Sequence, residues 1–363
     1  MINTSSVKEN SSGLTREAFQ KVVNGKQTDL YFLRNSNGME MAVTNYGATV
    51  VAIMVPDRHG KYSNVVLGHD SIDRVVHSPE PFLGTTIGRY GNRIAKGQFS
   101  LNGETYSLAI NNGPNSLHGG PKGFHAVVWD VVKAGNSSME FTYTSVDGEE
   151  GFPGNLVVCM TYTLTNDNEF VISYKATTDK STIVNLTNHA FFNLAGISNP
   201  SPEVCNNLLT INADFFIPVD GVCIPTGEIL KVEGTPFDFR QPAVVGDRID
   251  DKDQQIVNGA GYDHSFVLNK VQAGDLSFAA KCVEPVSGRS LEVYTTEPAV
   301  QLYSGNWLNG FAGAHAATFP RRSAICFETQ HFPDTPNRSY FPSAILNPGE
   351  EYKHTCIYKF GVE

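Results

Sequence analysis

The stretch Asn185-Leu-Thr-Asn-His-Ala-Phe-Phe-Asn-Leu-Ala-Gly196 ends an alternating run of residues that begins at Tyr174. Polar and apolar side chains alternate from Tyr174 to Leu186, which predicts a β-strand with one buried face. Polar side chains then crowd the single histidine, His189, two phenylalanines follow it, and Gly196 breaks the pattern. An imidazole held among amides and aromatic rings suits general acid–base chemistry near neutral pH. A lone histidine is more often a core or turn residue, so a functional role for His189 depends on whether other stretches of the chain point to the same kind of site.

Short apolar or alternating runs recur along the chain, and long helical periodicity is nearly absent. Turn dipeptides such as Asn102-Gly103 and Asp147-Gly148 separate many of the runs. Short helical turns are expected near 71–75 and 246–248, and residues 15–24 are interpreted as a strand entering a turn. Many short strands at turn spacing predict an all-β sandwich or barrel. The expected strands are 25–34, 39–46, 48–55, 64–67, 98–101, 104–109, 127–133, 139–145, 156–165, 170–177, 207–211, 265–268, 291–296, 300–304, 323–328 and 352–360.

The bulk composition fits one large folded unit. The chain has 363 residues, with 40% hydrophobic and 18% charged residues, which is enough apolar material for a sizeable core. Residues 1–14 are rich in serine and asparagine and predict a loose tail. No linker, low-complexity block or internal repeat divides the remainder, so residues 15–363 are expected to form a single domain.

Charge and cysteine usage exclude several classes of partner. A net charge of -10 without any run of basic residues argues against a nucleic-acid partner. No apolar run approaches membrane length. The six cysteines form no C-x-x-C pair and no zinc spacing, so they are expected to be reduced and mostly buried. The first 14 residues lack the apolar core of a signal peptide, which favours the cytosol, although a removed signal would leave no trace.

A glycine-rich stretch from Gly84 to Gly97 carries Arg89, Asn92 and Arg93. It fails the spacing of a phosphate-binding loop, because Lys96 precedes its glycine. Glycines let the backbone turn sharply around an adjacent Asn-Arg pair, and a guanidinium beside an amide suits a polyhydroxylated ligand or a carboxylate. Taken singly, these arginines are more often surface ion-pair residues.

Two further stretches place polar side chains beside glycine or at a strand entrance. Asn115-Ser-Leu-His-Gly-Gly120 sets His118 before two glycines, which permits close approach of a backbone or a ligand. Gly261-Tyr-Asp-His-Ser-Phe-Val-Leu268 sets Asp263 and His264 at the mouth of an apolar strand. Adjacent side chains on a strand point to opposite faces, so these two are not expected to share a pocket. A turn histidine and a turn-capping aspartate are the structural alternatives.

The last two stretches carry an amide and a carboxylate inside apolar strands. Gln301 lies in an alternating run with Trp307 close behind, an arrangement that can hold the face of a sugar, although such a tryptophan is more often in the core. Glu328 ends the apolar run of Ala324-Ile-Cys-Phe-Glu-Thr-Gln-His-Phe-Pro-Asp334. A carboxylate there is costly unless it is paired or hydrogen-bonded, so it indicates a functional role ahead of a solvent-exposed one.

Together these motifs resemble one family, the aldose 1-epimerases or galactose mutarotases, over nearly the whole chain from about Phe19. Each motif is modestly specific, but their joint presence in this order is highly specific. The resemblance implies a large antiparallel β-sandwich of the galactose mutarotase type. The matching motifs are Gly-Arg-x-x-Asn-Arg-Ile around Arg93, Asn-Ser-Leu-His-Gly-Gly around His118, Asn-Leu-Thr-Asn-His-x-x-Phe-Asn-Leu-Ala-Gly around His189, Tyr-Asp-His around Asp263, Gln-Leu-Tyr-x-Gly-Asn around Gln301 and Glu-Thr-Gln-His-x-Pro-Asp around Glu328.

The resemblance also implies a reaction and a set of roles. The expected reaction interconverts the α and β anomers of free aldohexoses such as galactose and glucose, without metal or other cofactor, by a monomer or homodimer. Glu328 would be the base on the C1 hydroxyl, His189 the acid on the ring oxygen and His118 a supporting donor. The residues expected to hold the other hydroxyls are Asn92, Arg93, Asp263 and Gln301.

Two alternatives remain open at this point. A hexose-6-phosphate mutarotase on the same fold would need extra basic residues, for which Arg89 is a candidate. A non-catalytic sugar-binding protein would be expected to have lost Glu328 or His189, and both are present.

Overall fold

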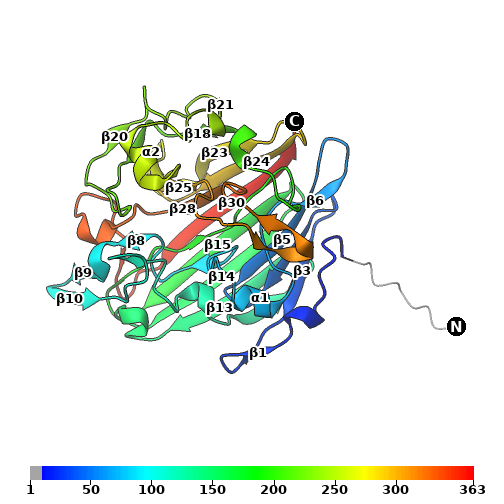
Figure 1. Ribbon diagram of the computed structural model, residues 1–363. Helices are drawn as coiled ribbons and strands as arrows, with labels where there is room; N and C mark the ends of the chain where they lie inside the picture. The colour runs from blue at the N-terminus through cyan, green and yellow to red at the C-terminus, as the bar shows by residue number, and fades with distance from the viewer. Residues whose placement is uncertain (1–9) are drawn as a thin grey trace.

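The computed structural model describes residues 10–363, and its main element is a nine-stranded antiparallel sheet, called the large sheet below (Figure 1). Buried and outward side chains alternate along its long strands, most regularly in β14, so one face is covered and the other meets solvent. The strands of the large sheet, in spatial order, are β12 (Asp130–Ala134), β13 (Ser138–Ser145), β14 (Leu156–Leu164), β15 (Glu169–Thr178), β30 (Tyr352–Val362), β24 (Arg289–Thr295), β23 (Ser277–Val283), β18 (Leu208–Ile211) and β21 (Ala243–Val244).

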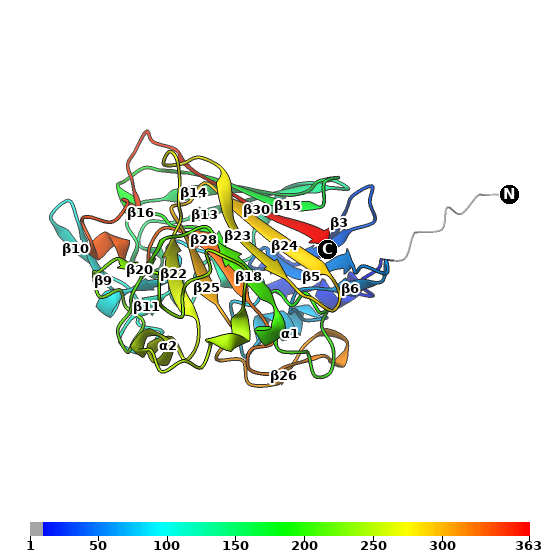
Figure 2. The same cartoon turned by 90° about the horizontal axis from the view of Figure 1, so that it is seen from above.

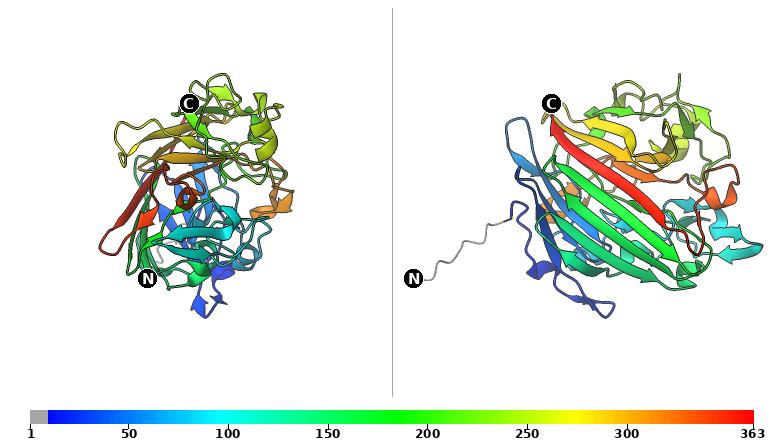
Figure 3. Two further views of the ribbon diagram at one scale, coloured as in Figure 1. Left: turned by 90° about the vertical axis from the view of Figure 1, so that its left-hand side faces the viewer. Right: turned by 180° about the vertical axis from the view of Figure 1, so that it is seen from behind.

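A five-stranded antiparallel sheet, called the small sheet below, packs on the buried face of the large sheet. Figure 2 shows β22, β25 and β28 beneath the long strands β14, β15 and β30, and the right view of Figure 3 shows the outer face of the large sheet. The hydroxyl of Tyr358 donates to the carbonyl of Phe327 at 2.6 Å and joins the two layers. The strands of the small sheet are β20 (Leu230–Lys231), β19 (Phe215–Ile217), β22 (Asp263–Val267), β25 (Ala299–Tyr303) and β28 (Cys326–Gln330).

A four-stranded sheet and several two-stranded ribbons complete the second layer. The four-stranded sheet consists of β3 (Leu30–Arg34), β4 (Glu40–Thr44), β5 (Thr49–Pro56) and β6 (Tyr62–Asn64). The ribbons are β1 (Val22–Val23) with β2 (Lys26–Gln27), β7 (Thr86–Ile87) with β17 (Thr187–Asn188), β8 (Arg93–Ile94) with β11 (Ser116–Leu117), β9 (Gln98–Leu101) with β10 (Glu104–Ser107), β16 (Thr182–Ile183) with β29 (Ile345–Leu346) and β26 (Phe311–Ala312) with β27 (Thr318–Phe319).

Helical structure is short throughout the described residues. The two α-helices are α1 (Ile72–Val76) and α2 (Gln254–Gly259). The 3-10 turns are Glu17–Phe19, Ala95–Gly97, Phe124–Ala126, Glu149–Gly151, Val204–Asn206, Val245–Asp247, Ala314–Ala316 and Thr335–Asn337. Between residues 10 and 363, no helix has the length and apolar character needed to cross a membrane.

The largest hydrophobic cluster of the interior includes residues from Leu33 to Phe360, and four smaller clusters surround it. Inward side chains of the large sheet, such as Met160 and Ile172, meet Val300 and Phe327 of the small sheet there. Burial of these apolar side chains stabilises the fold by roughly 25 cal/mol for each Å² of apolar surface removed from water. The predicted all-β sandwich is therefore confirmed.

Several local predictions need correction. Residues 15–24 contain a 3-10 turn at Glu17–Phe19, and only Val22–Val23 forms the expected strand. The alternating run that ends near Leu186 is broken after β15, and a separate strand begins at Thr182. Helix α2 was not predicted.

The predicted loose tail is wrong for its last residues, whereas residues 1–9 lie outside the described part of the chain. Leu14 is buried and packs in a small cluster with Phe19. The backbone N–H of Ser12 donates to the carboxylate of Glu40 at 3.0 Å, and the Ser12 carbonyl lies 2.8 Å from a ring nitrogen of His315. Both backbone groups of Ser12 therefore have hydrogen-bond partners, which hold this part of the chain against the fold.

All six cysteines are free thiols. Four of them are buried: Cys223, Cys282, Cys326 and Cys356. Cys159 is exposed, because it occupies an outward position of the alternating strand β14.

Candidate active site

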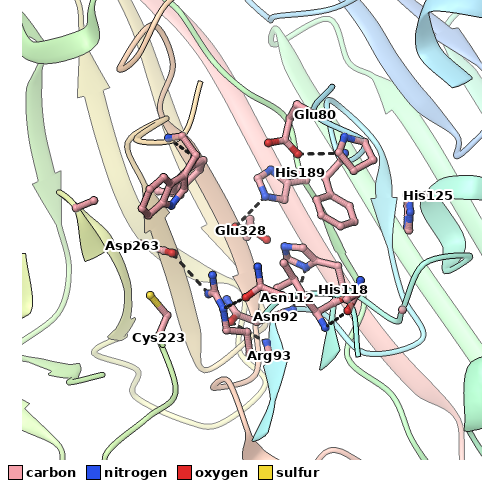
Figure 4. Close-up of a pocket in the computed structure, with 18 of the residues that line it drawn as sticks. Glu80, Asn92, Arg93, Asn112, His118, His125, His189, Cys223, Asp263 and Glu328 are labelled. Atoms are coloured by element: carbon pink, nitrogen blue, oxygen red, sulfur yellow. Dashed lines mark hydrogen bonds and ion pairs between the residues drawn. The ribbon is translucent and has the colours of Figure 1, made fainter. Parts of the chain in front are cut away.

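A cavity of about 900 Å³ opens on the side of the small sheet that faces away from the large sheet (Figure 4). This volume lies within the range of pockets that hold small molecules. Six of the seven predicted site residues line it, and the seventh, Gln301, lies directly behind Asp263. The six that line the cavity are Asn92, Arg93, His118, His189, Asp263 and Glu328.

Strand register brings the residues of the small sheet together. Gln301 of β25 is directly opposite Glu328 of β28, and Tyr303 of the same strand is opposite Asp263 of β22. Since alternate side chains of a strand share a face, these four residues lie on the cavity face. His264 is fully buried on the other face, where its ring contacts Phe237 at 4.6 Å between ring centroids. The prediction that Asp263 and His264 do not share a pocket is confirmed.

His189 is held between two aromatic rings. Its imidazole stacks on Phe191 at 4.7 Å and lies nearly parallel to Phe82 at 6.2 Å. The backbone N–H of His189 donates to the carbonyl of Thr85, and its carbonyl accepts from the N–H of Gly84. These contacts extend the pairing of β17 with β7 and fix the direction of the ring. Phe192, which follows Phe191 in the chain, points away from His189 and packs against Tyr358.

The side chains of His189 and Glu328 converge in the cavity. The Nε2 atom of His189 lies 3.5 Å from Oε1 of Glu328, slightly longer than an ordinary hydrogen bond. Burial raises the pKa of Glu328 well above its ordinary value, and the nearby Asp263 carboxylate raises it further. Burial lowers the pKa of His189 to about 3. Both shifts favour the uncharged form of the pair, in which the shared proton lies on Glu328 and His189 is neutral; transfer of that proton to His189 gives the charged form.

His118 is fixed as a proton donor toward the cavity. Its Nδ1 atom accepts the backbone N–H of Asn92 at 3.1 Å. A neutral imidazole that accepts through Nδ1 carries its proton on Nε2, and burial keeps the pKa of His118 well below its ordinary value. Gly119 has φ +81°, and a Cβ there would lie 2.0 Å from the Gly88 carbonyl. The expected close approach of two backbones beside His118 is therefore confirmed.

Arg93 and Asp263 form the opposite wall. The guanidinium lies 3.5 Å from Oδ2 of Asp263 through Nη1, and its Nε donates to Oδ1 of Asn112 at 2.9 Å. Gln301 donates to the other carboxylate oxygen of Asp263 at 2.7 Å. Gln301 therefore orients Asp263 and does not itself line the cavity. The Oδ1 atom of Asn92 accepts the backbone N–H of Arg93, which leaves the Asn92 amide donors for a ligand.

Three of these residues carry side chains of types that also bind metal ions. Ligand atoms of His118, His189 and Glu328 all lie within 4.8 Å of one another, so two imidazoles and a carboxylate converge as they do in some zinc sites. The tautomer of His118 opposes a metal, because Nε2 carries the proton that coordination would have to displace. The three groups fit proton transfer better than coordination.

Sequence reasoning missed several residues that line the cavity, and it left Trp307 open between a core position and a sugar-facing one. Trp307 is 64% exposed at the rim and not in the core, because β25 ends at Tyr303 and the chain turns outward. Glu80, Phe82 and His125 were not singled out. The ring of Phe82 contacts the rings of His118, His125 and His189. The available sequence signal for Phe82 was its position after two prolines and just before the glycine-rich stretch.

Arg89 does not face the cavity, which corrects its assignment as a candidate phosphate ligand. Its side chain is only 2% exposed. The guanidinium donates to the carbonyls of Pro153, Gly154 and Ser145 at 2.8, 2.9 and 3.1 Å, and to the Ser145 hydroxyl at 2.6 Å. Every one of these acceptors belongs to a loop or strand end, so Arg89 holds the glycine-rich stretch against the end of the large sheet.

Replacing Arg89 with methionine should lower the free energy of unfolding by about 3 kcal/mol or more, because it leaves buried carbonyl acceptors unpaired. Urea unfolding followed by fluorescence measures this change. The Arg321→Met variant is a suitable control, since Arg321 is exposed and donates only to the Ala260 carbonyl. An unfolding midpoint for Arg89→Met equal to that of the control would contradict the assigned role.

Acid sensitivity follows from histidines that the fold keeps neutral. An imidazole with a lowered pKa stays neutral in the folded state but takes up a proton below about pH 6.5 in the unfolded chain, so its contribution to stability is complete above pH 6.5 and is lost as pH falls. Carboxyl and imidazole groups whose pKa values are raised in the folded state oppose this trend, but they are fewer: Glu80, Glu150, Glu328 and His331. The histidines concerned are His69, His118, His125, His189, His264 and His354.

We therefore expect the free energy of unfolding to drop by about 2 kcal/mol or more between pH 7 and pH 5, since each such group contributes up to about 1.4 kcal/mol per pH unit. Urea titrations at fixed ionic strength test this. A midpoint that is constant or rises over that interval would contradict it.

Comparison with known proteins identifies the family of this chain. The aldose 1-epimerase family model matches residues 29–359. The galactose mutarotase of Bos taurus is 45% identical over 350 residues, which cover 96% of this chain and 99% of that protein. The aldose 1-epimerase of Escherichia coli is 38% identical over 342 residues, which cover 93% of this chain and 97% of that protein.

Solved structures show the same fold. A GalM/aldose epimerase homologue from C. elegans superposes with a TM-score of 0.84 at 30% identity and covers 92% of this chain and 99% of its own. The galactose 1-epimerase of Lactobacillus acidophilus gives a TM-score of 0.81 at 32% identity and covers 94% and 97%. The shared fold, the near-complete coverage and the matched motifs around the cavity lead to one conclusion: the chain belongs to the aldose 1-epimerase family.

Proposed function

We propose that this protein is an aldose 1-epimerase that interconverts the α and β anomers of free aldohexoses such as galactose and glucose by acid–base catalysis. The observation that carries the proposal is the convergence of Glu328 and His189, 3.5 Å apart, in a cavity of sugar-binding size. Their positions in the chain are far apart, so only a folded site explains the juxtaposition. The family membership and the relatives described above support the same reaction.

The chemistry needs two proton transfers and no redox change. One proton leaves the C1 hydroxyl and another reaches the ring oxygen, so the bond between C1 and the ring oxygen breaks and an open-chain aldehyde forms. Rotation about the bond between C1 and C2 turns the carbonyl over, and the reverse transfers close the ring on the other face. Each positioned acid or base is typically worth ~10²–10⁴-fold in rate.

The pair of Glu328 and His189 supplies both transfers. We assign Glu328 as the base on the C1 hydroxyl and His189 as the acid on the ring oxygen, with the roles exchanged during ring closure. The pair carries one proton, so ring opening moves a proton in at one residue and out at the other without changing the total charge. Ring opening starts from the charged form of the pair, with the shared proton on His189, and ends in the uncharged form, with the proton on Glu328. Burial favours this uncharged form, because water does not stabilise either charge, and so it assists the proton transfers of ring opening.

The surrounding polar groups are assigned to holding the sugar. The Nε2–H of His118 donates to the ring oxygen or a neighbouring hydroxyl, where negative charge develops as the ring opens. Arg93, Asn92 and Asp263 grip the remaining hydroxyls, and Gln301 keeps Asp263 in place. The sugar then stays bound while its C1 end turns.

Polarimetry on freshly dissolved α-D-galactose and α-D-glucose tests the proposal. The protein should accelerate the approach to the equilibrium rotation in proportion to its concentration and in the presence of a metal chelator. Rates equal to those of the buffer alone for a panel of aldoses, including xylose and arabinose, would overturn it. Calorimetry that showed galactose binding without such acceleration would instead favour a non-catalytic sugar-binding protein.

A sugar 6-phosphate is a poorer substrate candidate. Among the described residues that line the cavity, Arg93 is the one arginine or lysine, and Asp263 already lies beside it. The Asp263 carboxylate beside Arg93 would repel a phosphate. We expect a higher kcat/KM on glucose than on glucose 6-phosphate, measured in the same coupled assay.

A further inference from the structure

A second polar cluster lies behind the small sheet, on the face opposite the cavity. Its centre is His354 of β30, which is 1% exposed and stacks on Tyr174 at 5.0 Å between ring centroids. The neighbouring carboxylate of Glu297 lies 2.5 Å from Nδ1 of His331 and 3.9 Å from Nδ1 of His354. A buried histidine among polar partners costs desolvation, so its hydrogen bonds matter to what it does.

The two ring nitrogens of His354 contact the segment around β17 that carries the acid and the strand β28 that carries the base. Nδ1 lies 3.0 Å from the carbonyl of Leu186, which is three residues before His189. Nε2 lies 3.0 Å from the hydroxyl of Thr329, which directly follows Glu328. Thr329 and Glu328 point to opposite faces of β28, so one faces His354 while the other faces the cavity.

The chemistry of the partners fixes the direction of both hydrogen bonds. A carbonyl only accepts, so Nδ1 of His354 donates to Leu186, and Nε2 of the neutral ring then accepts from the Thr329 hydroxyl. Burial lowers the pKa of His354, which keeps the ring in this neutral form. One rigid imidazole therefore spans the short strand of His189 and the strand of Glu328, with Nδ1 and Nε2 at a fixed separation.

We infer that His354 is a positioning residue that sets the spacing between Glu328 and His189, although it touches no substrate. His331 adds to this link, since its backbone N–H donates to Oδ1 of Asn185, on the same segment as Leu186. The inference rests on the proposed function. Loss of the link should lower kcat and leave KM nearly unchanged, because contacts that do not involve His354 hold the residues that bind the sugar.

The chain offers a matched pair of variants to test this. Thr329 and Thr295 both place a hydroxyl near Nε2 of His354, at 3.0 and 3.3 Å, but only Thr329 lies on the strand of Glu328. Thr329→Val should lower kcat about tenfold to a hundredfold, with KM within about twofold, since a misplacement of 1 Å can cost that much. Thr295→Val should keep the wild-type kcat, even though it also loses an acceptor for the Glu297 N–H.

A purely structural role predicts a different pattern. In that case both threonine variants would lower the melting temperature, and the folded protein would keep the wild-type kcat and pH profile. The inference expects Thr329→Val to move the pH limits of kcat, because the spacing of two coupled groups sets how they share a proton. Equal kcat values for the two variants would overturn it.

A second variant covers the case in which Thr329→Val does not fold. His354→Asn keeps an amide donor near the position of Nδ1 but has no acceptor at the position of Nε2, so it should reproduce the loss of kcat. The double variant should be no slower than either single one, because both remove the same link. Unchanged kcat in these variants of an active enzyme would overturn this inference alone, whereas an inactive wild-type protein would overturn the proposed function as well.

Discussion

Glu328→Gln is expected to lower kcat for mutarotation by about 10³-fold or more while sugar binding stays within a few-fold of wild type. Glutamine has the same shape and hydrogen-bonding reach, but its amide cannot accept the proton of the C1 hydroxyl. The carboxylate it replaces is 2% exposed and lies 3.5 Å from His189, so no water replaces the lost base. Polarimetry gives the rate, and calorimetric titration with galactose gives the affinity.

Glu80→Gln is the matched control, because it makes the same chemical change in the wall of the same cavity. Burial raises the pKa of Glu80 to about 7, but its Oε1 accepts the N–H of Phe82 and it is not paired with His189. Its kcat should stay within about tenfold of wild type. A Glu328→Gln variant as active as this control would remove Glu328 from the role of base.

His189→Asn is expected to lower kcat by about 10²–10⁴-fold, the range of one general acid. Asparagine preserves a donor of similar size but does not exchange a proton near neutral pH. The ring also fills the space between Phe82 and Phe191, so part of the loss arises from a less well-ordered wall. Stopped-flow polarimetry over a range of galactose concentrations separates kcat from KM.

His125→Asn controls for the loss of a buried imidazole. His125 also lines the cavity and contacts Phe82 at 4.8 Å, and burial lowers its pKa to about 4, but its ring is not paired with Glu328. This variant should lose stability and keep most of its kcat. A change confined to KM in His189→Asn would make His189 a binding residue and not the acid.

The tertiary structure decided which polar residues meet the cavity and which support it from behind. Gln301 and Asp263 both belong to matched motifs, yet the pairing of β25 between β22 and β28 makes Gln301 a partner of Asp263. Arg89 is four residues before Arg93 in one glycine-rich stretch, but its guanidinium turns into the interior. Local pattern cannot distinguish these cases, because the acceptors of Arg89 come from residues about 60 positions further along the chain.

Strand periodicity gave a sound prediction of the sheet content, since the alternation of side chains is a local property of an extended backbone. It placed Asp263 and His264 on opposite faces correctly. The composition of residues 1–14 did not indicate the burial of Leu14, and residue type left Trp307 open between the core and a sugar-facing position. Burial depends on what packs against a residue and not on its neighbours in sequence. The hydrogen bonds that His354 makes with two distant strands are hidden for the same reason.

By itself, the sequence determined the all-β class, the family motifs and the identity of the candidate acid and base. Only the tertiary structure decided that Glu328 and His189 lie 3.5 Å apart, that His118 presents its Nε2 proton and that Arg89 is structural. The physical reason is that residue type and alternation are set by short-range sterics and hydrophobicity, whereas proximity is set by strand register and packing between residues far apart in the chain.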